Sequence, residues 1–500
     1  MRRLKHSIPL VLSAVIITAC GSTVQTQGQV GSRTAGTSGL AASSAQQPQD
    51  DAGLAGIGSD ATTTPAGTSG TAGVPTTSGR SVAPQQPGAV QERTTAQGGS
   101  IAKNGPVQIG FVTTSVGNAE AFGINPGTTY TDKAMYEAIV GDYNAHGGLA
   151  GHRILPVYGE TDTASNNWGS DFQAVCAKFT EDNHVKAVIG YIFVFLPSFE
   201  GCLAKAGVPH LYGGYQPGDV VDQGQYRTMV SSAHPPVDGF DLTALEGAER
   251  TGLLTKSTKL GLLIDTCADG DRAYRRSVEP WLKARAINYR TFIGDCARGG
   301  TDASSAASAI SSAQLQFASS GVNLVFGNAV ELLLFMNNAQ TQGYTPEYLT
   351  ATGGGALHAT GAAPSSQMKH LHGFGWTPTV DVDLQHQPAT TAAQKACTDR
   401  LVKHGLQPKA YNDFMAAYAT CDGLELYTQA LAVGANTPQA VVNAVATAEP
   451  RLVGALTYGG RLRESPNQRG GAAVYREYGW SNSCSCLTYR GALYPLPTAH

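Results

Sequence analysis

The stretch NAHGGLAGHRI, Asn144–Ile154, places three glycines between a helix-like segment and a strand-like one. The preceding residues, 131–143, carry Met135, Ile139 and Tyr143 at helical spacing, and the following residues, 153–158, read as a strand. A glycine in the left-handed conformation can end a helix. We therefore expect the helix to close at Gly147–Gly148 and the chain to turn at Gly151 into the strand. Such helix-to-strand returns are typical of parallel sheets with helical crossovers.

The same alternation of short apolar runs and helical segments continues on both sides of this stretch. The runs VQIGFVT (107–113), VKAVI (185–189) and VPHLY (208–212) form one series, and a second begins with KLGLLID (259–265). A nearly continuous apolar run is expected for a parallel strand that is covered on both faces. Because about 395 residues exceed one typical hydrophobic core, the two series predict two α/β lobes.

The N-terminus predicts an export signal. Basic residues precede an apolar stretch, Ile8–Ala19, that is too short to span a bilayer comfortably. The stretch ends at Ala19-Cys20, which resembles the bacterial lipoprotein signal, whose cysteine is diacylated. We expect residues 1–20 to be this signal peptide and Cys20 to carry the lipid that anchors the chain outside the cytoplasm. The alternative is an ordinary secretory signal with an incidental cysteine.

Residues 21–105 are almost entirely Gly, Ser, Thr, Ala, Gln and Pro. Such a segment buries too little apolar surface to offset its ordering entropy, so it predicts a disordered linker. Both a spacer through a cell wall and an O-glycosylated stalk fit this composition. The net charge of -3 and the lack of a basic stripe argue against a nucleic-acid partner.

Eight cysteines remain after Cys20, an even number that predicts disulfides in an exported protein. Eight cysteines allow 105 connectivities. Sequential pairing is the simplest, because each of the first three pairs then spans about one helix–strand unit. It gives Cys176–Cys202, Cys267–Cys296, Cys397–Cys421 and Cys484–Cys486, of which the last closes a very small ring.

Several stretches in this order resemble the type I periplasmic binding proteins, in the branch that binds branched-chain amino acids. They are VQIGFVTTSVGNAEAFG, YNAHGGLAGHRILPVYGETD, AGVPHLYGG and LGLLIDTCADGDRAYRRSV. The resemblance covers about residues 106–495. It implies two Rossmann-like lobes, each a parallel sheet with helices on both faces, joined by a three-strand hinge. We expect lobe one to comprise 106–232 and 367–465, and lobe two to comprise 233–366 and 466–500.

The resemblance also implies a function. A small solute would bind in the cleft between the lobes, at the carboxyl ends of the strands, and be delivered to an ABC permease. The alternative is a receptor module of the same fold that senses a ligand and signals to a partner protein. In either case we expect a monomer with no cofactor and no catalytic activity.

The loops at the carboxyl ends of the predicted strands supply the candidate ligand-binding residues. They are Ser115, Glu120, Tyr191, Phe193, Tyr215, Gln216, Asp269 and Asn328. Tyr191 and Phe193 could equally pack beneath the next helix. Where the family has a Ser/Thr run, this sequence has YIFVFLP, and at the family's acidic position in lobe two it has Gly353–Gly355. These differences predict a less polar or ring-bearing solute in place of an α-amino acid.

Motifs for catalysis are lacking in the part of the sequence after the linker. It contains no Gly-x-Ser-x-Gly elbow, no His-Glu-x-x-His and no phosphate-binding loop. His370 and His372 could share one face of a strand and ligate zinc if His358 converged on them, but a solvated strand is the simpler interpretation. We therefore predict no metal site.

Overall fold

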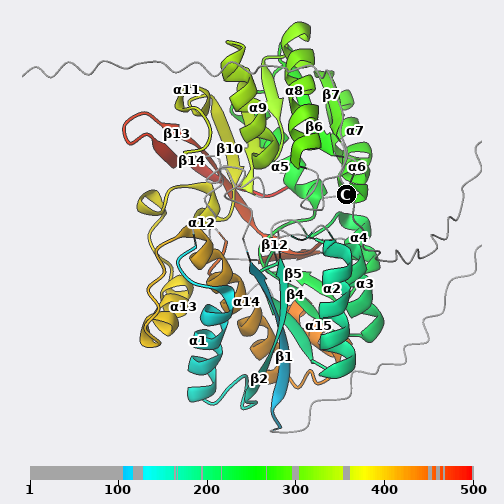
Figure 1. Ribbon diagram of the computed structural model, residues 1–500, viewed down its shortest axis with the longest axis vertical. Coiled ribbons are helices and arrows are strands. Elements are labelled where there is room, and N and C mark those ends of the chain that lie inside the picture. Colours follow the sequence, from blue (N-terminus) through cyan, green and yellow to red (C-terminus); the bar gives the residue numbers. More distant parts are fainter. Residues whose placement is uncertain are drawn as a thin grey trace, which may run out of the picture. The chain divides into compact units, whose positions relative to one another are not determined.

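The computed structural model describes most of the chain after the predicted linker, in two seven-stranded sheets (Figure 1). The described residues are 105–115, 128–162, 165, 167–192, 195–214, 217–265, 267–294, 303–352, 361–448, 453–457, 462–465 and 468–497. The predicted signal and the linker, apart from Gly105, lie outside these ranges. Within them, no helix is both long and apolar enough to cross a membrane.

The sheet of lobe one has the strand order β11-β12-β5-β4-β3-β1-β2. Its strands are β1 (Val107–Ser115), β2 (Ile154–Asp162), β3 (Ala187–Gly190), β4 (His210–Tyr212), β5 (Met229–Ser231), β11 (Leu462–Ser465) and β12 (Gln468–Ala472). All neighbouring pairs are parallel except β11 with β12. The helices are α1 (Asp132–Ala145), α2 (Trp168–Ala177), α3 (Pro197–Ala206), α4 (Val220–Gln225), α13 (Ala392–Lys403), α14 (Tyr411–Ala432) and α15 (Pro438–Ala448), with a π-helical turn at Lys178–Asp182.

The sheet of lobe two has the order β14-β13-β10-β9-β8-β6-β7. Its strands are β6 (Lys259–Asp265), β7 (Asn288–Gly294), β8 (Leu324–Phe326), β9 (Glu347–Ala351), β10 (Leu371–Gly375), β13 (Val474–Ser481) and β14 (Cys486–Pro495). The helices are α5 (Val237–Arg250), α6 (Ala268–Ala273), α7 (Glu279–Ala284), α8 (Ala303–Ser320), α9 (Ala329–Thr341) and α11 (Ser365–Met368), with a π-helical turn at Tyr274–Val278. Two further short elements, α12 (Pro378–Asp381) and the 3-10 turn η5 (Leu384–His386), follow β10 in the chain and precede α13.

Both sheets are covered on both faces, as their apolar runs predict. In β3, Ala187 and Ile189 belong to a core shared with α1 and α14, whereas Val188 belongs to a core shared with α2 and α3. In β6, Leu262 faces α5 and α7, and Leu263 faces α8 and α9. Figure 1 shows these helices on the two sides of their sheets. The strands are therefore held by burial of alternate residues on opposite faces.

The Asn144–Ile154 stretch forms the helix-to-strand return that its glycines predict. α1 ends at Ala145, and the left-handed Gly148 (φ 74°) donates its N–H to the carbonyl of Tyr143 at 2.8 Å. The Asn144 side chain then holds both backbone groups of Ile154, at 2.7 and 3.0 Å. These bonds join the end of α1 to the first residue of β2, at the edge of the sheet away from the strands' carboxyl ends.

The chain passes between the two sheets three times: after β5, after β10 and after β12. The first passage follows Ser231, next to the expected lobe boundary between residues 232 and 233. The other two passages do not fall at the expected boundaries between 366 and 367 and between 465 and 466. β10 pairs in parallel with β9 and so belongs to lobe two, while β12 pairs with β5 and so belongs to lobe one. An apolar run predicts a strand, but its sheet is decided by long-range pairing.

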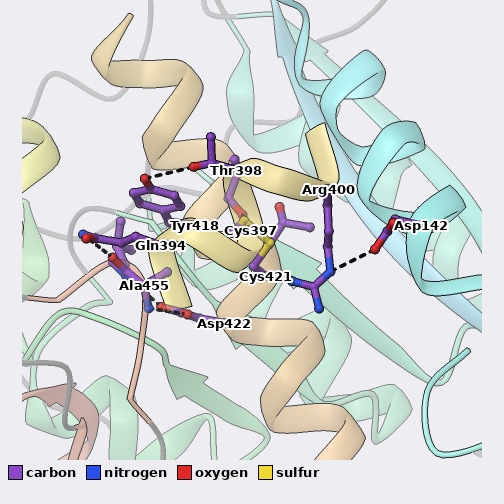
Figure 2. Close-up of a disulfide and its surroundings, with 12 residues drawn as sticks. Asp142, Gln394, Cys397, Thr398, Arg400, Tyr418, Cys421, Asp422 and Ala455 are labelled. Atoms are coloured by element: carbon purple, nitrogen blue, oxygen red, sulfur yellow. Dashed lines mark hydrogen bonds and ion pairs between the residues drawn. A yellow bond between two sulfur atoms is a disulfide. The ribbon is translucent and has the colours of Figure 1, made fainter. Parts of the chain in front are cut away.

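Three disulfides lie wholly within the described residues and follow the sequential pairing: Cys176–Cys202, Cys397–Cys421 and Cys484–Cys486. Cys267 is also disulfide-bonded, and its predicted partner, Cys296, lies outside the described residues. Figure 2 shows the Cys397–Cys421 bridge between α13 and α14. Beside it, the buried carboxylate of Asp422 accepts the backbone N–H groups of Ala455 and Leu456 at 2.6 and 3.0 Å.

Candidate ligand-binding site

A cavity of about 70 Å³ opens at the carboxyl ends of β6 and β8 in lobe two. Its residues come from α5, β6, α6, the π-helical turn that follows α6, the end of β8 and the start of α9. They are Val237, Phe240, Asp241, Leu262, Leu263, Ile264, Asp269, Gly270, Tyr274, Val278, Phe326, Gly327, Asn328 and Glu331. This edge is where open α/β sheets bind their ligands.

Local structure fixes the rim of the cavity. Asn328 caps α9: its side-chain oxygen accepts the N–H of Glu331 at 3.3 Å, and the Glu331 carboxylate accepts the N–H of Asn328 at 3.4 Å. This reciprocal capping box holds both residues just after the carboxyl end of β8. Tyr274 and Val278, which also line the cavity, begin and end the π-helical turn, a helix form that is frequent at functional sites.

The cavity combines acidic and aromatic side chains. Three carboxylates line it, those of Asp241, Asp269 and Glu331, and none of the lining residues is basic. Phe240 and Phe326 are buried and form an apolar part of the wall. Burial also raises the pKa of the Tyr274 phenol, with the neighbouring Tyr289 adding to the shift. The lining therefore contains carboxylates and aromatic side chains and no basic side chain.

The corresponding edge of lobe one carries Ser115, the exposed last residue of β1, which lies opposite Asp162 of β2. One residue earlier, the N–H of Thr114 donates to Asp132 at 3.0 Å. Burial raises the pKa of Asp132 to about 6, even though this hydrogen bond lowers it. Tyr191 follows β3 at the same edge, where it is partly buried and packs against the lobe-one core.

Ion pairs join the two lobes beside the cavity. Arg272 of α6 donates to Asp219 at 2.7 Å and to Asp222 at 2.8 Å, both at the start of α4 in lobe one. Arg276 bridges Asp219 and Asp238. Burial alone would raise the pKa of Asp219, but the two guanidinium groups hold it below its usual value. The same helix, α6, thus presents Asp269 to the cavity and Arg272 to lobe one.

The structure places four of the eight candidate ligand residues. Asp269 and Asn328 line the cavity together, and Ser115 and Tyr191 lie at the carboxyl edge of lobe one. Glu120, Phe193, Tyr215 and Gln216 lie outside the described residues, as do Gly353–Gly355.

Sequence reasoning missed the contribution of α5 to the cavity. Phe240 and Asp241 come from this helix, which follows the first passage between the lobes, whereas the candidates were sought in loops after strands. The sequence position of α5 could have indicated them, because a helix that directly follows a passage between the lobes lies next to both.

His370 and His372, considered above as possible zinc ligands, both contact one carboxylate instead. Their ring nitrogens lie 3.0 and 2.8 Å from the Glu347 oxygens, and Arg490 contacts the other ring nitrogen of His372 at 2.9 Å. Hydrogen bonding, first from His372, holds the pKa of Glu347 below its usual value. His358 lies outside the described residues.

No protein-family model and no curated protein matches this sequence. Solved structures do match in fold. A leucine-binding protein from Thermotoga maritima is 14% identical, with a TM-score of 0.55, over 78% of this chain and 99% of the other. A solute-binding protein of an ABC transporter from R. palustris, in complex with 4-hydroxybenzoate, is 15% identical with a TM-score of 0.56, over 78% and 98%. A fatty acid ABC transporter substrate-binding protein from Thermomonospora curvata is 13% identical with a TM-score of 0.55, over 80% and 96%.

These matches cover nearly the whole of each solved structure. Together with the two mainly parallel sheets, they show that this chain has the type I periplasmic binding protein fold. The matched proteins are solute-binding proteins whose ligands differ widely in chemistry, so the ligand of this chain has to be inferred from its own residues.

Proposed function

We propose that this chain is an extracytoplasmic solute-binding lipoprotein, which captures a small solute between its two lobes and delivers it to an ABC permease. The cavity at the carboxyl edge of lobe two is the observation that supports it most directly. At about 70 Å³ it is smaller than a complete ligand site, which typically encloses at least about 300 Å³. Lobe one would supply the remaining wall on closure, with Ser115 and Tyr191 among its contacts.

The lining of the cavity suggests which part of the solute enters lobe two. Carboxylates repel another carboxylate and attract ammonium or hydroxyl groups, and the aromatic walls favour a flat apolar body. We therefore propose a ring-bearing solute whose hydrogen-bond donors point into lobe two. Any acidic group of the solute would face lobe one.

The N-terminal segment would tether the binding lobes. In this proposal Cys20 carries the lipid, and residues 21–105 let the lobes reach the permease or the outer medium. Replacing Cys20 with Ser should move the full-length protein from the membrane fraction to the soluble fraction or the medium. Retention of the Cys20→Ser protein in the membrane would refute the lipid anchor without bearing on solute binding.

Solute binding is testable by thermal shift against a library of aromatic acids, aromatic amines, amino acids and fatty acids. A ligand at one hundred times its Kd should stabilise the protein by about 2.7 kcal/mol. Asp269→Asn should weaken binding of the best solute at least tenfold. The matched control is Asp271→Asn on the same helix, because Asp271 pairs with Arg275 and does not line the cavity. A library with no stabilising solute, or equal affinities of the two variants, would count against this site.

A further inference from the structure

The turn of the β13–β14 hairpin carries a disulfide that closes only a very short loop. Ser481 and Cys486 form the last pair of the antiparallel ladder, and residues 482–485 make the turn. Cys484 and Cys486 are only two positions apart. Because the stabilisation by a disulfide grows with the length of the loop it closes, this bridge constrains the unfolded chain far less than the other bridges. Its structural role is therefore small.

The side chain of His386, a potential metal ligand, lies close to these two sulfurs. His386 ends the 3-10 turn Leu384–His386, almost one hundred residues earlier in the chain. Asp383 fixes this turn to the start of β14, since it donates its N–H to the carbonyl of Leu487 at 3.2 Å and accepts the N–H of Leu487 at 2.6 Å. As a result, the potential ligand atoms of His386, Cys484 and Cys486 all lie within 4.8 Å of one another.

We propose that this cluster is a reduction-gated site for a thiophilic cation, with two thiolates and one imidazole as ligands. In tetrahedral zinc sites the sulfurs lie about 2.3 Å from the metal, which separates them by about 3.8 Å. The Cα atoms of Cys484 and Cys486 are 5.2 Å apart, a spacing that accommodates both a disulfide and two converging thiolates. Conversion between the disulfide and the metal-bound dithiolate therefore does not require the hairpin to unfold.

The ligand set and its exposure define the kind of cation. The cluster holds no carboxylate, and thiolate with imidazole favours zinc or copper(I) over calcium or magnesium. His386 is exposed, whereas Cys486 is buried, so the metal would be held at the surface. Three protein ligands leave the fourth position of a tetrahedral cation to water or to a second molecule.

Reduction of the bridge and binding of the cation each balance in electrons and protons. A dithiol reductant gives two electrons and two protons to the Cys484–Cys486 bridge and becomes a disulfide itself. The cation then displaces the two thiol protons and binds the thiolates and the neutral His386 ring. In the reverse direction a disulfide oxidant takes the two electrons from the thiolates and two protons from water and becomes a dithiol, while the Cys484–Cys486 bridge reforms and releases the cation.

The test uses the full-length protein, treated briefly with a dithiol that is then removed under anaerobic conditions. Alkylation and mass spectrometry should show Cys484 and Cys486 opened first, because Cys484 is only partly buried, whereas Cys176, Cys267 and Cys397 of the other bridges are buried. Titration with Zn²⁺ should then give one more bound ion per chain than in a Cys484→Ser/Cys486→Ser double variant treated identically. Co²⁺ should give the visible absorption of a tetrahedral thiolate site in the wild type alone.

His386→Ala should weaken Zn²⁺ binding at least tenfold, and Gln385→Ala, which removes the neighbouring exposed side chain, should leave it unchanged. Circular dichroism of each variant checks that it is folded. Equal zinc contents in the wild type and the double variant would overturn the site. So would opening of the buried bridges before Cys484–Cys486, or a His386→Ala protein that binds zinc as tightly as the wild type.

Discussion

Gly147 and Gly148 are neighbours with similar backbone conformations and different surroundings. Both have positive φ, 96° and 74°. A Cβ on Gly147 would meet nothing within 4 Å, whereas a Cβ on Gly148 would lie 2.0 Å from the carbonyl oxygen of His152. Alanine at Gly147 therefore incurs only the backbone cost of the left-handed region, and alanine at Gly148 adds a clash with the main chain.

We predict that Gly147→Ala lowers the free energy of unfolding by about 1–2 kcal/mol and Gly148→Ala by at least about 3 kcal/mol. Urea denaturation of the two variants measures the difference. Equal losses would mean that the turn relaxes freely and that the contact with His152 does not restrict it. The sequence could predict this turn because the preference for glycine at a positive φ depends only on the local backbone.

Asp381 is a buried carboxyl in α12, close to the second passage between the lobes. Its Oδ2 accepts hydrogen bonds from Thr352, at 3.0 Å, from the Thr377 N–H and from Tyr489. Burial raises its pKa to about 7, more than these bonds lower it. The folded state therefore holds a proton that the unfolded state, with a pKa near 3.8, releases earlier.

Because the folded pKa is raised, the stability that this proton supplies is full below about pH 4 and is lost as the pH rises through about 7. Asp381→Asn, which stays neutral, should reduce the fall in unfolding free energy between pH 4.5 and 7.5 by up to about 3 kcal/mol. The exposed Asp399→Asn is the control. An unchanged pH slope in Asp381→Asn would show that Asp381 does not titrate in this range.

At the scale of elements, apolar composition decided whether the sequence could predict a strand. The apolar runs 208–212 and 259–265 contain β4 and β6, although β4 has only three residues. β5 and β12 were not predicted, because β5 is three residues long and ends in a serine, and β12, QRGGA, contains no large apolar residue. The cavity has a similar limit: Asp269 and Asn328, which follow strands, were candidates, but the contribution of Phe240 depends on how α5 packs.

The disulfides also differ at this scale, by the length of chain that each one closes. Cys176–Cys202 joins α2 to α3 across 26 residues, and Cys484–Cys486 spans 2. On the loop-entropy estimate, replacing the first pair with serines should cost about 3.5 kcal/mol and the second about 1–2 kcal/mol. Thermal denaturation of the two double variants tests this. A larger loss for Cys484→Ser/Cys486→Ser would mean that this bridge holds more than its own turn.

At the scale of the whole molecule, α6 connects ligand binding to the contact between the lobes. Asp269 faces the cavity, and three residues later Arg272 pairs with Asp219 and Asp222 of lobe one. The acidic partners are almost completely buried, while Arg272 is about one-third exposed. A ligand that reorients α6 would therefore shift the ion pairs, and separation of the lobes would leave buried carboxylates without their guanidinium partner.

We predict that Arg272→Gln favours separation of the lobes and weakens solute binding. X-ray scattering of the variant should give a larger radius of gyration, and a larger decrease on addition of solute, than the wild type shows. Arg275→Gln is the matched control, because Arg275 lies on the next turn and pairs with Asp271 of its own lobe. If both variants scatter like the wild type, the ion pairs of Arg272 do not set the lobe equilibrium, and the contact of Arg276 with Asp219 suffices to hold the lobes together.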